Sequence, residues 1–200
     1  KDAAICFIAV GDHESDHYPL QAGQFESGDE ELDMWLTRTY LEGKGGANAG
    51  ESYMLAWYFA ARRTAIDSME KRGKKGFLFT IGDEPNLNVL PASAITAITG
   101  DPAQASMKSK DLLEEAKKLY HVYHIEVTRN DEEGKSLARL QWKERLGQNC
   151  VFVDDYTKIP EVISAIVLEH SDLSAQTRMP VDDEQEEAQE GKKEDQEIIL

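Results

Sequence analysis

Two hydrophobic periodicities alternate along this chain, one typical of buried strands and one typical of amphipathic helices. Continuous apolar runs predict strands that are covered on both faces, and a shorter, more polar run after a turn predicts an edge strand. The buried strands are expected at 5–10, 77–81, 122–127 and 151–153, and the edge strand, antiparallel to its neighbour, at 20–24.

Apolar residues spaced three or four positions apart predict helices between these strands. Their expected spans are 29–43, 51–71, 92–98, 110–119, 137–146 and 160–170. This alternation predicts an α/β fold with a doubly wound, mainly parallel sheet and helices on both faces. The periodicity ends after residue 170, so we expect a domain over 1–170 and an acidic, disordered tail over 171–200 without a packed core.

The charge of the chain narrows the classes of partner. Asp and Glu number 38 against 22 Lys and Arg, a net charge of −16, and residues 181–200 hold nine acidic residues against two lysines. Such a protein repels phosphates, which argues against nucleic acid and against anionic membranes as partners. No run is long enough to cross a bilayer, and no signal peptide is visible, so a cytoplasmic protein is expected. Cys6 and Cys150 lie in apolar runs, as buried free thiols do.

Candidate chemistry gathers in the loops that follow the strands, where ligands of doubly wound sheets bind. One acidic loop follows the first strand, another follows 77–81, and the glycine-rich stretch 43–50 leads into a helix. Their carboxylates suit a hard divalent ion, Mg²⁺ or Mn²⁺, with Asp12 and Asp83 as the predicted ligands. The alternative to a metal site is that these are ordinary solvated loops without a ligand, in which His13 and His17 are solvated histidines. The full predicted rim comprises Asp12, Glu14, Asp16, Asn48, Glu51, Ser52 and Glu84.

Three motifs in this order resemble the von Willebrand factor type A (vWA) domain of bacterial intracellular proteins. The loop after the first strand reads GDHESDHYPLQAGQFES over 11–27, a helix opens with ESY at 51–53, and KKGFLFTIGDE spans 74–84. The resemblance covers about residues 3–170. It implies the predicted α/β fold and a divalent-metal site assembled from three loops.

The chain departs from the vWA pattern at two of those loops. Asp83 matches the aspartate that follows the family's fourth strand, whereas Ala47 stands where many relatives carry a threonine. The family's opening strand and its Asp-x-Ser-x-Ser loop have no counterpart, and the acidic loop around Asp12 lacks the serine spacing. On this resemblance the chain begins at the second strand. We therefore expect an upstream segment of a longer polypeptide, or a separate chain, to supply the first strand between 5–10 and 77–81.

Two functions stay open on the sequence. The first is a protein-interaction module of vWA type, which binds a partner protein through the rim of the sheet, with or without a metal. The second is a metal-dependent hydrolase or phosphotransferase, in which Asp12 and Asp83 hold the ion and Glu84 acts as the base. The sequence carries no recognisable nucleophile–base pair, which favours the module over an enzyme.

Overall fold

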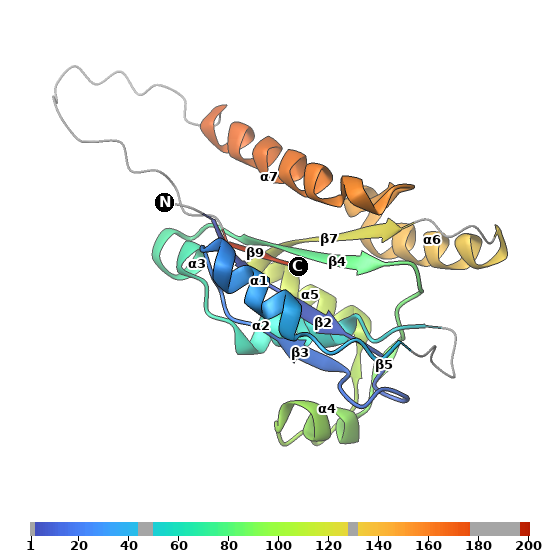
Figure 1. The fold of residues 1–200 in the computed structure, drawn as a ribbon. Helices are drawn as coiled ribbons and strands as arrows, with labels where there is room; N and C mark the ends of the chain where they lie inside the picture. Colours follow the sequence, from blue (N-terminus) through green and yellow to red (C-terminus); the bar gives the residue numbers. More distant parts are fainter. Residues whose placement is uncertain (1–2, 44–49, 128–131, 177–196) are drawn as a thin grey trace, which may run out of the picture.

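The computed structural model describes residues 3–43, 50–127, 132–176 and 197–200. At its centre lies a parallel sheet of five strands in the order β1-β9-β4-β7-β8, which confirms the predicted α/β class (Figure 1). Three of the predicted buried runs form strands of this sheet. The five strands are β1 (Ala4–Cys6), β4 (Gly76–Gly82), β7 (Tyr120–Val127), β8 (Cys150–Val153) and β9 (Glu197–Ile199).

Helices cover both faces of the sheet, so the chain is doubly wound and Rossmann-like. Figure 1 shows α7 on one side of the sheet, with α2 and α5 on the other. The larger core contains Leu55, Leu112 and Trp142, and the smaller core beneath α7 contains Ile163 and Val167. The helices that supply these residues are α2 (Met54–Arg63), α5 (Ser109–Leu119), α6 (Glu132–Leu146) and α7 (Ile159–Gln176).

The first apolar run does not form the single strand that its pattern predicts. It divides at Phe7 into β1 and β2 (Ile8–Val10), and β2 leaves the central sheet to pair antiparallel with β3 (Leu20–Ala22). The Phe7 carbonyl accepts a hydrogen bond from the Gly23 backbone at 2.9 Å, so the pairing with the β3 segment begins at the division. The prediction of one strand over 5–10 is therefore wrong. The strand predicted at 20–24 is present and antiparallel, but it lies in a separate two-stranded sheet and not at an edge of the central sheet.

The predicted boundary at residue 170 also differs from the structure. Helix α7 continues to Gln176, and β9 returns to the centre of the sheet between β1 and β4. Ile199 is 0% exposed and belongs to the larger core, whereas Ile198 is 8% exposed and belongs to the smaller one. The expectation that the tail has no packed core is thus wrong for Ile198 and Ile199. They belong to a strand between β1 and β4, where a strand from an upstream segment or a separate chain was expected. Residues 177–196 of the predicted tail lie outside the described residues.

The remaining helices follow the predicted order with shifted ends. The helix expected over 51–71 divides at Thr64 into α2 and α3 (Asp67–Arg72), and Gly73 ends α3 with a positive φ of 64°. Helices α1 (Asp29–Arg38) and α4 (Ala92–Thr99) flank the sheet, and β5 (Val89–Leu90) pairs with β6 (Met107–Lys108). Cys6 and Cys150 are free and buried, as expected. Within the described ranges, none of the helices combines the length and the apolar character needed to span a membrane.

Candidate functional site

The predicted rim forms where the start of α2 meets the loops after β2 and β4. Glu51 bridges to Asn86: the Glu51 N–H donates to the Pro85 carbonyl at 2.8 Å, and the Leu87 N–H donates to the Glu51 carbonyl at 2.9 Å. The Asn86 side chain then accepts the Met54 N–H at 3.0 Å, in the first turn of α2. These bonds fix the entry of the helix against the loop that carries Asp83 and Glu84.

The loop after β2 is a turn held by its own carboxylates. Asp12 is buried, and its side chain accepts hydrogen bonds from the Glu14 N–H and the Ser15 hydroxyl, both at 3.1 Å. Asp16 accepts the Asp12 N–H at 2.7 Å. A Cβ at Gly11 would lie 2.2 Å from the Asp16 carboxylate, so a larger residue there would displace this side chain from its hydrogen bond to the Asp12 N–H. The acidic spacing of this loop is therefore explained in part by local structure.

A buried serine–histidine contact joins this turn to α2. The His13 N–H donates to the Ser52 hydroxyl at 3.0 Å, and the His13 Nδ1 lies 2.7 Å from the same oxygen. Asp12 Oδ1 is 3.4 Å from the Ser52 Oγ. The His13 side chain is only 5% exposed, so the expectation of a solvated histidine is wrong for His13, while His17 is exposed. Sequence reasoning missed this pair because the two residues are far apart in the chain.

The Ser52–His13 contact has the distance of a nucleophile–base pair but not its accessibility. Ser52 is 0% exposed, and its oxygen already accepts a backbone N–H. A nucleophile must reach a substrate carbonyl or phosphorus, and this hydroxyl faces only protein. The contact therefore serves to pin the acidic turn against the start of α2.

Glu51 interacts with the carboxylates of the other two rim loops, those after β2 and β4. Burial and, to a smaller extent, the negative charges of Asp16, Asp12, Glu84 and Asp83 together raise the pKa of Glu51 to about 7. Its Oε2 is buried and has no hydrogen-bond partner among the described residues. An ionised carboxylate in such a place is unfavourable unless a proton or a cation accompanies it.

The loop after β4 is set by close packing against Tyr53. A Cβ at Gly82 would lie 1.9 Å from the Tyr53 hydroxyl, so glycine is required where the strand leaves the sheet. The Trp142 indole N–H donates to the Glu84 carbonyl at 3.1 Å, which holds the loop from below. These contacts place Asp83 and Glu84 beside Glu51 at the carboxyl end of β4.

A row of buried polar side chains lies beneath the rim on β7. His124 is fully buried and stacks on Trp142 with ring centroids 3.6 Å apart, and its Nδ1 lies 2.9 Å from the Thr80 hydroxyl. Burial lowers the pKa of His124 to about 3. Glu126 pairs with Arg139 at 3.4 Å, and burial raises the pKa of this carboxyl. The sequence predicted only a buried strand here and did not single out either side chain as a candidate site residue.

The structure thus brings together most of the residues predicted for the rim. Asp12, Asp16, Asp83 and Glu84 are close enough to Glu51 for their charges to raise its pKa, and the buried Ser52 Oγ lies 3.4 Å from Asp12 Oδ1. Glu14 is on the outside, with its side chain 61% exposed. Asn48 lies outside the described residues, as does Ala47.

The side chains at this rim give partial support to a metal site. Among the described residues, no group of three or more His, Cys, Asp or Glu side chains has an arrangement that holds an ion. Mg²⁺, however, keeps several waters and binds directly to only one or two carboxylates. The unpartnered Glu51 oxygen among four further carboxylates fits such an ion.

Comparisons with models of protein families, with curated proteins and with solved structures found no match for this chain.

Proposed function

We propose that this chain is a protein-interaction module of vWA type that binds its partner through the acidic rim, with a divalent cation at the interface. The observation that carries the proposal is the setting of Glu51. One of its oxygens is buried and has no hydrogen-bond partner among the described residues, and its charge interacts with the carboxylates of Asp12, Asp16, Asp83 and Glu84 from two other loops.

A divalent cation relieves the repulsion at this rim. Five carboxylates in one region favour cation uptake, and burial strengthens the attraction because the local dielectric constant is low. Glu51 and Asp83 are the residues proposed to bind the ion. Asp12 stays in the surrounding shell, because its oxygens accept hydrogen bonds within the turn. When bound, Mg²⁺ or Mn²⁺ supplies a positive charge with water ligands that a carboxylate of the partner can replace.

The hydrolase alternative has less support from the same contacts. It requires Asp12 as a metal ligand, yet both oxygens of that side chain are engaged in the turn. It also needs an accessible reacting group, and the one serine–histidine contact at the rim is buried. A binding role requires only that the rim attract a cation and a complementary surface of the partner protein.

Calorimetric titration of the chain with Mg²⁺ and Mn²⁺ tests the proposal. Glu51→Gln should weaken cation binding about tenfold or more, because it removes the charge with the unpartnered oxygen. Glu14→Gln is the matched control, since this neighbouring carboxylate is solvated, and it should leave binding nearly unchanged.

Two outcomes would contradict the proposal. If neither ion bound, or if the two substitutions had equal effects, Glu51 would not be the centre of a cation site. Turnover of a simple phosphate ester that requires Mg²⁺ and is lost in Glu84→Gln would instead favour the hydrolase.

A further inference from the structure

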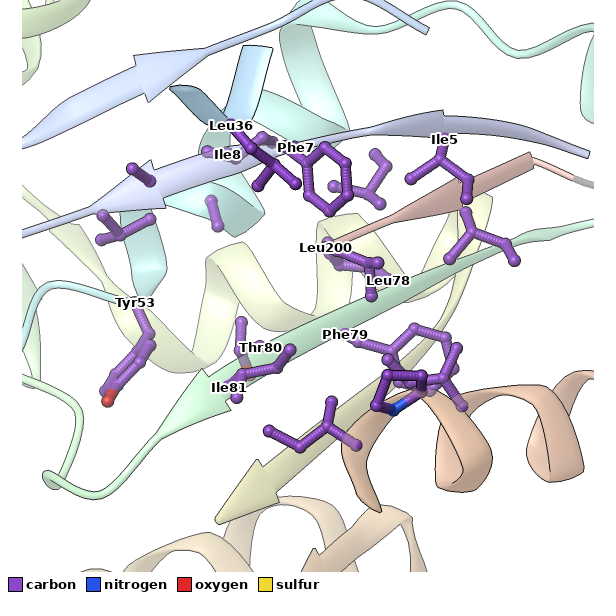
Figure 2. Close-up of a pocket in the computed structure, with 18 of the residues that line it drawn as sticks. Ile5, Phe7, Ile8, Leu36, Tyr53, Leu78, Phe79, Thr80, Ile81 and Leu200 are labelled. Carbon is purple, nitrogen blue, oxygen red and sulfur yellow. The ribbon is translucent and has the colours of Figure 1, made fainter. Parts of the chain in front are cut away.

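Helix α7 covers one face of the central sheet (Figure 1). Ile163 and Val167 of this helix pack in the smaller core with Phe79 of β4 and Tyr123 of β7. Figure 2 shows the Phe79 ring on the side of β4 that faces α7. The helical spacing of Ile163 and Val167 continues to His170, so a titratable side chain follows on the face that otherwise packs apolar groups.

A second histidine lies opposite, on β7. Side chains alternate along a strand, so His121 points to the same face as Tyr123, while Val122 points into the larger core. The His121 and His170 rings have their centroids 4.4 Å apart, and the centroid of each lies 5.3 Å from that of the Phe77 ring. The two histidines are thus in contact across the boundary between α7 and the sheet.

Three further titratable groups act on this pair or on its hydrogen-bond partner. The Tyr123 hydroxyl lies 2.7 Å from His170 Nε2, which fixes the orientation of that ring. On α7, the charge of Glu169 acts on the Tyr123 hydroxyl. The Lys75 ammonium donates to a carbonyl in the last turn of α5 at 2.6 Å, and its charge acts on His121 from the loop before β4.

Protonation of His121 is unfavourable while α7 is docked. Burial and, to a smaller extent, the positive charges of His170 and Lys75 lower the pKa of His121 from 6.5 to about 4. Removal of the helix would solvate the ring and return its pKa toward the ordinary value. The stability that docking gains from the neutral ring is therefore present above pH 6.5 and is lost as the pH falls toward 4.

We propose that the His121–His170 pair is a pH-sensitive switch, which holds α7 against the sheet at neutral pH and weakens its attachment in acid. Release of α7 uncovers an apolar face of β4 and β7 that includes Phe77, Phe79 and Ile125. The pair lies at the amino ends of these strands, whereas the acidic rim lies at their carboxyl ends. The switch is therefore separate from the cation site of the proposed function and does not depend on it.

Hydrogen exchange of the full chain at pH 7 and pH 5, corrected for the intrinsic exchange rates, measures the docking of α7. The two pKa values of His121 correspond to a change in docking of about twentyfold between these pH values, and partial exposure of the ring reduces it to about tenfold. Protection at 163–170 should fall by this factor. At both pH values it should be lower than protection at 112–116 in α5, because α7 opens before the whole domain unfolds.

Two substitutions on β7 separate the switch from general sensitivity to acid. His121→Phe keeps a ring against Phe77 that cannot be protonated, so protection at 163–170 should change less than about twofold between pH 7 and pH 5. His124→Phe is the matched control, because His124 lies on the opposite face of the same strand and stacks on Trp142. It should leave the tenfold fall at 163–170 in place.

Proton NMR of the parent chain tests the pair without depending on the folding of a variant. The ring signals of His121 should titrate with a midpoint near pH 4. His170→Gln removes the neighbouring positive charge and keeps a polar group for the Tyr123 hydroxyl. This substitution should therefore raise the midpoint of His121.

Three results would overturn the switch. Equal protection of 163–170 and 112–116 at both pH values would mean that α7 leaves the sheet only when the whole domain unfolds. An unchanged fall at 163–170 in His121→Phe would mean that another group governs the attachment of α7. A His121 midpoint near 6.5, or one that His170→Gln does not move, would mean that docking does not suppress protonation of the pair.

Discussion

Replacing Ile199 with alanine tests whether the packing of β9 in the core stabilises the fold. The Ile199 side chain is 0% exposed and lies between β1 and β4, where the neighbouring strands are also buried and cannot easily close over a void. Truncation of a buried isoleucine to alanine costs about 2–5 kcal/mol, from lost burial and from the cavity that remains. The free energy of unfolding of a domain is only about 5–15 kcal/mol, so the loss should be large.

Urea denaturation followed by circular dichroism measures this change directly. For a chain of this size, a loss of 2–5 kcal/mol should lower the denaturation midpoint by about 1 M or more. Leu140→Ala is the matched control: Leu140 is 65% exposed on α6, and its truncation should change stability by no more than about 0.5 kcal/mol. If the two variants had the same midpoint, β9 would not be docked between β1 and β4.

Three further predictions follow from buried groups. Burial lowers the pKa of His124 from 6.5 in the unfolded chain to about 3 in the folded chain. The stability that the neutral side chain contributes is therefore present above pH 6.5 and is lost as the pH falls toward 3. The full pKa difference corresponds to about 5 kcal/mol. His124→Phe should therefore flatten the decline of the melting temperature between pH 6.5 and 4, and an unchanged slope would contradict this. Glu51 has the opposite sign: its raised pKa means that stability present below pH 4.5 is lost as the pH rises through about 7. In metal-free buffer at pH 8, Glu51→Gln should melt above the parent chain, and a lower melting temperature would refute the repulsion at the rim. Gly82→Ala should cost about 1–3 kcal/mol through the clash with the Tyr53 hydroxyl, and Tyr53→Phe should recover part of that loss in a double-mutant cycle.

The local sequence pattern was sufficient to predict three of the buried strands of the sheet. The runs that became β4, β7 and β8 could be predicted as strands, because a strand covered on both faces consists mostly of apolar residues. The division at Phe7 could not be seen, since β1 and β2 are equally apolar and differ only in their partners. Strand β9 was missed for the same reason. Three apolar residues after an acidic stretch become a strand only when both neighbours are known.

The candidate site shows a similar limit. The acidic loops were found from their position after strands, which is a topological rule that sequence can apply. The central place of Glu51 and the burial of His13 depend on how those loops pack, and no spacing within one loop encodes that. His124 and Glu126 looked like core positions because their neighbours on β7 are apolar.

The central position of β9 has a consequence for the order in which the domain is made. Ala4 pairs with Glu197, and Phe77 pairs with Ile198, so the strand between β1 and β4 is synthesised long after both of them. While the ribosome is still translating the helices, β1 and the facing edge of β4 are exposed without their shared neighbour. Such unpaired apolar edges are the regions that chaperones cover and that aggregate when left uncovered. Completion of the sheet must therefore wait until residue 199 has left the exit tunnel, long after β1 and β4 have been made.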